Sequence, residues 1–563
     1  MTTASSAVTA VVPIVEESRA EQMFPTLTAA QVGRIAGHGH VRQVAQGDVL
    51  VEPGEQTARF FVVTDGQVEI VRPAGAAEDP MAVLRPGQFT GEVNMLSGRR
   101  GFARIRAIAP GAVIEVDREV LLTLVQTDSD LGEILMRAFL LRRVELIARG
   151  LGDVVVVGSS HSPGTLRIRE FLTRNGHPYA SLDLDRDASV QDLLDRFQVG
   201  IADVPVVICR GAVVLRNPTN QQIAACLDFN DAIDRSRVRD LVVVGAGPAG
   251  LAAAVYGASE GLDVLVLEST APGGQAGASS RIENYLGFPT GISGQELAAR
   301  AYNQAEKFGA QLMVGNETKR LTCDHKPYAI EFEDGSRVPA RAVIIATGAE
   351  YRRLSIANLA RFEGTGVYYA ATFMESQLCS GDEVVVVGGG NSAGQAAVFL
   401  AQSARRVHML VRSDGLADTM SRYLIRRIEE HPAIVVHVRT EIVGLEGDHH
   451  LERVRWRDNQ LGRAETHDIR HVFSMAGAVP STRWLQSCVA LDARGFIKTG
   501  ADLTPEDLAA AHWPPGRPPH LLETSLPGVF AVGDVRSGSV KRAASAVGEG
   551  SIAIAAVHQV LHD

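Results

Sequence analysis

Cysteine is scarce in this chain of 563 residues, which contains five cysteines. They are spread widely, at Cys209, Cys226, Cys323, Cys379 and Cys488. Closely spaced cysteines are typical of disulfide scaffolds and zinc clusters, so this spacing predicts neither, and no metal site is expected. The cysteine content instead indicates a reduced, cytoplasmic protein.

Basic residues are fewer than acidic ones, and the apolar segment near the N-terminus is short. The chain has 55 Lys and Arg against 65 Asp and Glu, a formal net charge of −10, which argues against general binding of nucleic acid or of an anionic membrane surface. No lysine or arginine precedes the short apolar stretch near the N-terminus, and Pro13 interrupts that stretch. Neither a secretory signal nor a membrane span is therefore predicted there.

The composition that remains is that of a folded globular protein, with 45% hydrophobic and 21% charged residues. The length corresponds to about four domains at roughly 150 residues each. Strand and helix patterns predict an α/β multidomain fold. Its expected parts are a disordered tail at 1–23, a β-roll with a final helix at 24–150, a small α/β unit at 151–228, a linker at 229–238 and a large unit at 239–563. A hairpin signal stands at Asp65-Gly66.

The strongest motif is the glycine-rich run GAGPAG at 245–250, which follows an apolar strand and opens an alanine-rich helix. Its glycines allow a tight turn and a close approach of the backbone, and the helix N-terminus offers N–H groups to a pyrophosphate. Glu268 ends the next strand, 18 residues after Gly250, where a carboxylate accepts hydrogen bonds from a ribose. The segment predicts a dinucleotide site.

A second glycine-rich run, GGGNSA at 388–393, also follows an apolar strand. At the position that corresponds to Glu268, the chain has Arg412. A cation there pairs with a 2′-phosphate, so this copy predicts NADPH rather than NADH, with Arg422 as a second candidate. The alternative is that Arg412 is a solvated residue at a strand end.

Residues 238–563 resemble the low-molecular-weight thioredoxin reductases, which are flavin-dependent disulfide reductases. The resemblance rests on the two glycine-rich runs and on GGQAG at 273–277, IENYLGFP at 282–289, ATG at 346–348 and TSLPGVFAVGD at 524–534. It implies two Rossmann-like domains: a FAD domain made of 239–348 and 478–563, and an NAD(P)H-binding domain at 349–477 inserted into it. A homodimer is also implied.

The same resemblance implies FAD and NADPH as cofactors and assigns residues to each. The FAD set is Gly245, Gly247, Pro248, Ala249, Gly250, Glu268, Gly274, Gln275, Asn284, Ala346, Gly348, Gly533, Asp534 and Ala543, the last standing where the family usually has a glutamine. The NADPH set is Gly388, Gly390, Asn391, Ser392, Ala393, Arg412 and Arg422.

One departure from that family concerns its redox-active CxxC pair. Aligning the Ala-Thr step of GVYYAATFMES places Ala370 and Phe373 in the two cysteine positions, so no catalytic residue is assigned. Without a dithiol the flavin cannot pass electrons to an internal disulfide, and Cys379, a single thiol, is interpreted as a packed residue. Electrons are then expected to go to an external acceptor: an iron–sulfur protein, a quinone, dioxygen or a partner disulfide. The alternative is a redox sensor with little turnover.

Residues 151–228 resemble the glutaredoxin and thioredoxin fold. Val204-Pro205 corresponds to the cis-proline strand of that family. The redox motif would follow the first strand, where the chain has Ser162-Pro163-Gly164-Thr165 and therefore no cysteine. We expect a redox-inactive domain used for docking or dimer contacts, and whether Cys209 pairs with Cys226 stays open.

Residues 24–150 resemble cyclic-nucleotide-binding domains through FTGEVNMLSGRRGFARIRA at 89–107. Gly91 and Glu92 correspond to the ribose-binding pair of that family. Its phosphate-binding arginine, however, is replaced by Gly101, which leaves the neighbouring arginines, Arg100 and Arg104 among them, as candidates for the anion. The alternative is a barrel that has lost its ligand.

Overall fold

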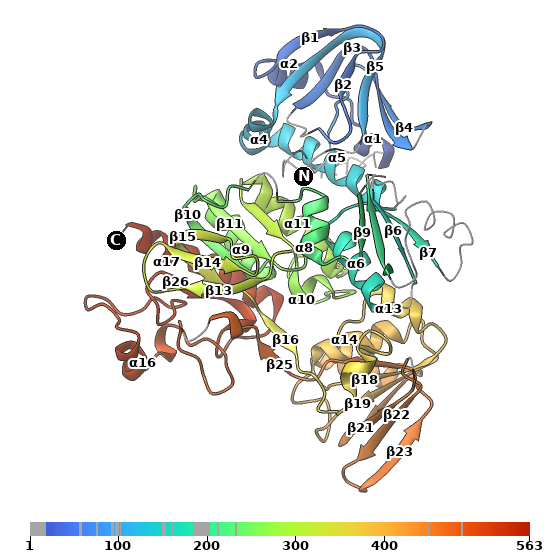
Figure 1. Ribbon diagram of the computed structural model, residues 1–563, viewed down its shortest axis with the longest axis vertical. Coiled ribbons are helices and arrows are strands. Elements are labelled where there is room, and N and C mark those ends of the chain that lie inside the picture. Colours follow the sequence, from blue (N-terminus) through green and yellow to red (C-terminus); the bar gives the residue numbers. More distant parts are fainter. Residues whose placement is uncertain are drawn as a thin grey trace, which may run out of the picture. The chain divides into compact units, whose positions relative to one another are not determined.

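The computed structural model describes residues 19–55, 59–74, 77–91, 95, 101, 103–148, 154–159, 162–184, 203–210, 213–230, 233–448, 450–485 and 488–562. The chain forms two compact units, residues 1–146 and residues 147–563, and each is described by itself (Figure 1). Residues 19–23 of the predicted tail form a short helix, α1 (Arg19–Met23), and the rest of that segment lies outside the described residues.

The first unit is a β-roll of antiparallel strands with helices packed on it. Its sheet has the order β1-β5-β3-β4, and β2 pairs with β5. The elements are α2 (Ala29–Ala36), β1 (His40–Val44), β2 (Val49–Val51), β3 (Arg59–Ala74), β4 (Ala77–Leu84), β5 (Arg104–Asp117), α4 (Arg118–Thr127) and α5 (Ser129–Ala148). Phe60, Phe89 and Phe139 pack with ring centroids 5.7 to 6.3 Å apart, which ties β3 and α5 into one aromatic core.

The hairpin predicted at Asp65-Gly66 is wrong. β3 continues through both residues, and its two halves pair with the same long strand, Val63 with Val113 and Val68 with Ala107. The register shifts on both sides of Asp65, and Gly66 has a φ of +79°. The glycine accommodates an irregularity in the ladder rather than a chain reversal.

The second unit begins with a four-stranded sheet of order β7-β6-β8-β9. β6 pairs parallel with β7 and antiparallel with β8, and the peptide bond between Val204 and Pro205 is cis, as the cis-proline resemblance predicts. The elements are β6 (Val154–Gly158), α6 (Pro163–Arg174), β7 (Ala180–Asp183), β8 (Val206–Cys209), β9 (Val213–Arg216) and α8 (Asn220–Cys226).

This small sheet shares its hydrophobic core with the domain that follows it. Val156 and Phe171 are fully buried in the same cluster as Leu241 and Ile554. Figure 1 shows α6 of the small domain beside α10 and α11, and Arg174 of α6 donates to the carbonyl of Gly274 in α10. The two parts therefore have no solvent layer between them.

The predicted linker at 229–238 begins with residues that are packed into this core. Phe229 is 6% exposed and stacks on Phe171. The Asn230 amide donates to the carbonyl of Val314 at 2.9 Å and accepts from its N–H at 3.0 Å. Composition alone suggested a solvated connection, because the segment is polar overall, but its first residues are anchored.

Residues 239–348 and 488–562 build a seven-stranded sheet with helices on it. The order is β12-β11-β10-β15-β14-β13, with β26 added beside β15. The pairs from β12 to β15 and the β15–β26 pair are parallel, and β13 and β14 are antiparallel. The elements are β10 (Arg239–Val244), α9 (Pro248–Ser259), β11 (Val264–Glu268), α10 (Gly274–Gly277), α11 (Gly294–Lys307), β12 (Gln311–Val314), β13 (Thr318–Thr322), β14 (Tyr328–Phe332), β15 (Arg337–Ile345), α16 (Pro505–Ala510), β26 (Val529–Ala531) and α17 (Ala543–His562).

A second parallel sheet, of order β17-β24-β18-β19-β20, lies in the inserted segment together with a three-stranded sheet, β21-β22-β23. The chain enters and leaves this domain through a two-stranded ribbon in which Ala349 pairs with Pro480. The elements are β16 (Ala349–Tyr351), α12 (Leu359–Phe362), β17 (Val367–Tyr368), α13 (Phe373–Leu378), β18 (Glu383–Val387), α14 (Asn391–Leu400), β19 (Arg406–Leu410), α15 (Arg422–Glu430), β20 (Ile434–His437), β21 (Thr440–Glu446), β22 (Arg453–Asp458), β23 (Arg463–His467), β24 (His471–Ser474) and β25 (Ala478–Pro480).

The prediction that the chain is fully reduced is wrong for one pair of cysteines. Cys323 and Cys488 form a disulfide across 165 residues of sequence. Cys323 follows β13, and both cysteines pack against the buried cluster around Leu321 and Val489. The sheet brings together two segments whose proximity sequence spacing cannot reveal.

One helix, α17, is long and apolar enough to cross a membrane by length and composition. In the fold it packs on α9: a side chain on Gly550 would lie 2.2 Å from the carbonyl oxygen of Ala249. Ala553, Ile554 and Val557 are buried in the shared core. One face of α17 is therefore packed in the core of the fold.

Candidate functional site

The first glycine-rich loop joins β10 to α9 at the carboxyl edge of the parallel strands. A side chain on Gly245, which has a φ of +106°, would lie 2.4 Å from the carbonyl oxygen of Ala346. A Cβ on Gly250 would lie 1.9 Å from the carbonyl oxygen of Gly245, whereas one on Gly247 would meet nothing within 4 Å. Gly245 and Gly250 therefore make the turn, and Gly247 leaves room for a ligand against the backbone.

Polar groups for a dinucleotide converge on this loop. α9 begins without a side-chain cap, so its first N–H groups are available to an anion. The Glu268 carboxylate accepts hydrogen bonds from the backbone N–H of Ala246 at 2.8 Å and of Thr270 at 2.9 Å. These bonds hold the carboxylate at the end of β11, the position from which such sites bind a ribose hydroxyl.

Most of the residues predicted for FAD line one cavity around this loop. They are Gly245, Gly247, Pro248, Ala249, Glu268, Gly274, Gln275, Ala346, Gly348, Gly533, Asp534 and Ala543. Gly250 is buried in the turn, and Asn284 is exposed and outside the set that lines the cavity. The glycine cradle, the uncapped helix and the ribose carboxylate together fit a flavin dinucleotide.

Sequence reasoning missed several residues of this cavity, among them Tyr351, Trp484 and Lys541. The Lys541 ammonium donates to the carbonyl oxygen of Asp534 at 3.0 Å. Burial lowers the pKa of Lys541 and raises the pKa of the Asp534 carboxyl. No motif marks these residues, because they reach the cavity from β16, from the segment after β25 and from the turn before α17.

The second glycine-rich loop has the same design at the start of α14. A side chain on Gly388, with a φ of +139°, would lie 2.7 Å from the carbonyl oxygen of Met475. α14 also begins without a side-chain cap. The Asn391 side chain accepts from the N–H of Ser421 at 2.8 Å, which ties the loop to the start of α15.

Arg412 and Arg422 lie near this second loop, after β19 and at the start of α15, and both are exposed. Within the part of the chain that the structure describes, neither has a carboxylate partner. Arg427 of the same helix, by contrast, pairs with Glu283 at 2.6 Å. Arg412 and Arg422 are thus left available to a phosphate.

The two positions aligned with the missing CxxC lie at the N-terminal side of α13. Ala370 lines a cavity of about 600 Å³, and Phe373 is the first residue of α13, with its side chain outside the described set. Cys379 is fully buried, and burial raises the pKa of its thiol to about 12. It is a packed residue, as predicted, and its thiol stays protonated at neutral pH.

The cysteine-free motif Ser162–Thr165 stands at the start of α6. A side chain on Gly164 would lie 3.0 Å from the ring of Pro205, so the cis-proline packs against the motif. Pro163 of this motif and Leu166, the residue after it, line the same cavity as Ala370. The structure therefore brings the two cysteine-free motifs to one place.

The candidate ligand residues of the first unit are only partly described. Glu92 and Arg100 lie outside the described residues. Gly91 has a φ of +100°, and its carbonyl accepts from Arg142 at 2.7 Å. The Arg104 guanidinium binds Glu52 at 2.9 Å and also Glu78, so its role toward a ligand stays a prediction.

Comparison with known proteins gives matches for both units. Residues 239–550 match the family model described as pyridine nucleotide-disulphide oxidoreductase, and residues 41–128 match that of the cyclic nucleotide-binding domain. Thioredoxin reductase from Mycolicibacterium smegmatis is 34% identical over 322 residues, which are 56% of this chain and 94% of that protein. NADPH-dependent thioredoxin reductase 3 from Arabidopsis thaliana is 31% identical over 368 residues, 62% of this chain and 65% of that protein.

Solved structures show the same likeness. Lactococcus lactis thioredoxin reductase in the FR conformation aligns with a TM-score of 0.51 at 27% identity, over 57% of this chain and 99% of that one. The thioredoxin reductase of T. acidophilum aligns with a TM-score of 0.51 at 30% identity, over 57% of this chain and 98% of that one.

Proposed function

The chain belongs to the pyridine nucleotide-disulphide oxidoreductase family, and we propose that it is an FAD-dependent NADPH oxidoreductase that passes electrons to an acceptor outside the chain. The proposal depends chiefly on the pair of glycine-rich loops, each with an uncapped helix N-terminus. The first loop lies beside the carboxylate of Glu268, and the second loop lies near two exposed arginines, Arg412 and Arg422. This difference suits two different dinucleotides.

The residues around the first loop would hold FAD. Gly247 leaves room for its pyrophosphate at the N-terminus of α9, and Glu268 accepts from its ribose. FAD, when bound, supplies the transfer of two electrons between the nicotinamide and the acceptor. Lys541, on the carbonyl of Asp534, places a cation at the same cavity.

The residues around the second loop would hold NADPH. The N-terminus of α14 faces the pyrophosphate, and Arg412 and Arg422 bind the 2′-phosphate. Ser392 lines both the flavin cavity and the cavity beside Ala370. The nucleotide-binding loop is therefore adjacent to the flavin cavity, as hydride transfer requires.

Rapid anaerobic mixing of the flavin-loaded protein with NADPH tests this function. We expect the visible flavin absorbance to bleach within seconds, because a bound nicotinamide in the correct geometry reacts as an intramolecular partner. Bleaching by NADH should be slower than bleaching by NADPH. An absorbance unchanged over minutes would contradict the proposal and favour a sensor role.

The acceptor is proposed to be something other than a protein disulfide. In the aligned positions, Ala370 and Phe373 provide no dithiol, and the thiol of Cys379 is buried. Thiolate attack is the first step of disulfide reduction. With thioredoxin as the sole acceptor we expect little turnover, and robust turnover that a Cys379→Ser variant abolishes would contradict this.

Three further properties belong to the same proposal: a cytoplasmic location, a homodimer, and regulation by a small ligand in the first unit. Apolar side chains exposed on α9 and α17, such as Tyr256 and Ile552, support the dimer. The match of residues 41–128 supports the ligand. Calorimetric titration with cyclic AMP and cyclic GMP tests the last point, and the absence of heat at millimolar ligand would contradict it.

A further inference from the structure

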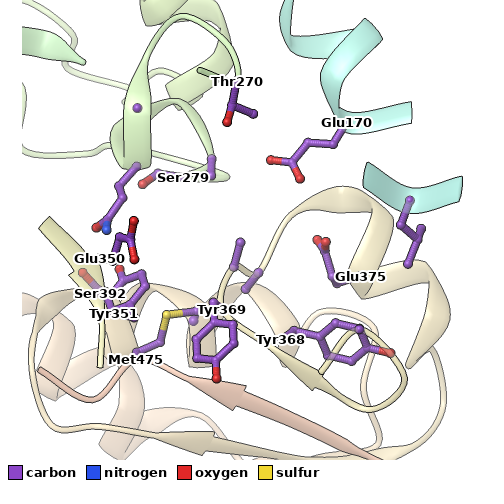
Figure 2. Close-up of a pocket in the computed structure, with 18 of the residues that line it drawn as sticks. Glu170, Thr270, Ser279, Glu350, Tyr351, Tyr368, Tyr369, Glu375, Ser392 and Met475 are labelled. Atoms are coloured by element: carbon purple, nitrogen blue, oxygen red, sulfur yellow. The ribbon is translucent and has the colours of Figure 1, made fainter. Parts of the chain in front are cut away.

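A cavity of about 600 Å³ lies where three parts of the second unit meet. α6 of the small four-stranded domain forms one wall, the segment around Thr270 and Ser279 a second, and the inserted domain a third. Figure 2 shows Glu170 and Glu375 extending into it from opposite walls, with Tyr368, Tyr369 and Met475 along the floor. Its volume is within the range of small-molecule sites, roughly 300–1,000 Å³.

The two cysteine-free motifs form opposite sides of this cavity. Pro163 comes from the motif at the start of α6, and Ala370 from the position aligned with the CxxC. A side chain on Gly364 would lie 2.7 Å from Pro163, so the two domains are in contact at the rim. Thiol–disulfide exchange requires two sulfur-bearing motifs to meet in this manner. Here, among the residues that the structure describes, no cysteine lines the space between the two motifs, and that space is a cavity.

α6 is fixed in place over this cavity. The Arg174 guanidinium donates to the carbonyl of Gly274 at 2.8 Å, and the Asn175 amide donates to the carbonyl of Thr270 at 3.0 Å. Phe171 of the same helix is buried in the core shared with the FAD domain. A folded protein therefore cannot approach the Ala370 side through this wall, whereas a small molecule can occupy the space behind it.

The aromatic side chains of the cavity suit a flat ligand. Tyr351, Tyr368 and Tyr369 offer aromatic surface, and Leu166 and Met475 add apolar surface. The charge of Glu170 is balanced by Arg174 at 2.9 Å. Aromatic side chains stack on planar conjugated rings.

Glu375 brings a carboxyl group to the cavity from α13. Burial raises the pKa of Glu375, and hydrogen bonds from Thr372 act in the opposite direction. The backbone N–H of Thr372 donates to the carboxylate at 2.9 Å, and its hydroxyl donates as well. A carboxyl group held in this way is suited to deliver a proton to an oxygen of a bound ligand.

We propose that this cavity is the acceptor site and that it takes a two-electron acceptor of the quinone class. The proposal depends on the oxidoreductase function proposed above. The overall step balances: the C–H bond of the reduced nicotinamide breaks, its two electrons and hydrogen reach the quinone, and Glu375 supplies the second proton. NADP⁺ and a hydroquinone with two new O–H bonds result, and water reprotonates Glu375.

The position of the cavity also predicts the kinetic order. It shares Tyr351 and Ser392 with the flavin cavity, and Ser392 belongs to the nucleotide-binding loop. A quinone and the nicotinamide end of the nucleotide would therefore occupy neighbouring or overlapping space. We expect NADP⁺ to compete with the quinone for the oxidised protein.

Binding of a quinone to the oxidised, flavin-loaded protein without NADPH is the first test. The probe is 2-methyl-1,4-naphthoquinone, followed by quenching of flavin fluorescence. A Leu166→Trp variant fills the cavity from α6 and should weaken binding by at least about 10-fold, about 1.4 kcal/mol. Val213→Trp places the same side chain on β9, outside the cavity, and should leave binding unchanged.

The same two variants separate this proposal from the proposed function. Both should bleach with NADPH at the rate of the unmodified protein, because Val213 lies outside both cavities and Leu166 lines only the part that the flavin cavity does not share, away from Tyr351 and Ser392. Normal bleaching without quinone binding, or with undiminished binding to Leu166→Trp, would overturn the acceptor site alone. Absence of bleaching in all three proteins would overturn the oxidoreductase function.

A Glu375→Gln variant tests the proton donor. Its amide keeps an oxygen for the N–H of Thr372, so quinone binding should stay within about twofold of the unmodified protein. Oxidation of the NADPH-reduced protein by the quinone should slow by on the order of 10²-fold and lose its dependence on pH. An unchanged rate and pH profile would show that Glu375 does not supply the proton.

Discussion

The two glycine-rich loops of the second unit use the same backbone design for different purposes. At the first, Glu268 is held by two backbone N–H groups inside a cavity formed by both halves of the FAD domain. At the second, Arg412 and Arg422 are exposed. The first arrangement suits a resident cofactor, and the second suits a nucleotide that binds and leaves. We infer that the loop itself binds the pyrophosphate, whereas the surroundings determine which dinucleotide is held and for how long.

The largest expected effect is loss of FAD on substituting Gly250, the last glycine of the first loop, whose counterpart in the second loop is Ala393. A Gly250→Ala variant would place its Cβ 1.9 Å from the carbonyl oxygen of Gly245, so the turn cannot form and we expect the purified protein to lack FAD. The corresponding residue of the second loop, Ala393, already carries a Cβ. An Ala393→Gly variant is the control and should retain FAD.

Flavin content, measured by absorbance after release of the cofactor, decides this comparison. Full occupancy in Gly250→Ala would mean that the first loop tolerates the same side chain as the second. The structural distinction between the loops would then be wrong.

A smaller effect is expected from reversing the charge at the second loop. An Arg412→Glu variant replaces the cation proposed to bind the 2′-phosphate with an anion, and one charged hydrogen bond corresponds to about 1.5–3 kcal/mol. We expect the KM for NADPH to rise by roughly 10- to 150-fold and the KM for NADH to change little. Steady-state kinetics with both nucleotides measure the effect.

The control for this variant is Arg406→Glu, at the opposite end of β19. It makes the same change of charge away from the loop, so the KM for NADPH should stay close to that of the unmodified protein. Equal effects of the two variants would show that Arg412 acts only through the general field of the domain.

The smallest effect concerns acid sensitivity, which we expect in the inserted domain. The Nδ1 atom of His408 lies 3.0 Å from the Nε2 atom of His437. Both rings contact Trp456, and His467 stacks on the same tryptophan. Burial lowers the pKa of each of these histidines. The unfolded chain therefore binds more protons, and stability should fall as the pH drops below the ordinary histidine value of about 6.5.

Thermal unfolding of the protein between about pH 7.5 and pH 5 measures this dependence, since the ordinary histidine pKa of about 6.5, which applies to the unfolded chain, lies in that interval. A His437→Gln variant should flatten the curve. The exposed His325 of the FAD domain provides the control, and His325→Gln should leave the curve unchanged. A curve that is identical in all three proteins would remove the histidine cluster as its cause.

The sequence was sufficient where function depends on short segments of chain. The turn at Gly245 and Gly250 and the carboxylate of Glu268 belong to one strand–loop–helix–strand segment, so spacing alone predicted them. Asn284, by contrast, was assigned by resemblance to the family and lies exposed outside the cavity.

Features that depend on distant segments could not be predicted in this way. The Cys323–Cys488 disulfide joins residues 165 apart, and the cavity beside Ala370 needs α6, more than 190 residues earlier in the chain. Even the local signal at Asp65-Gly66 gave the wrong result, because strand pairing with β5 outweighed the turn preference of the dipeptide. Tertiary packing decides such cases.

The core shared by the small four-stranded domain and the FAD domain has a consequence for how the protein folds. Because Val156, Phe171 and Leu241 are buried in one cluster, neither part presents a finished surface by itself. The two must gain their stability together, as one cooperative folding unit. The small domain is therefore a structural component of its neighbour, and deleting it would expose part of the core of the FAD domain.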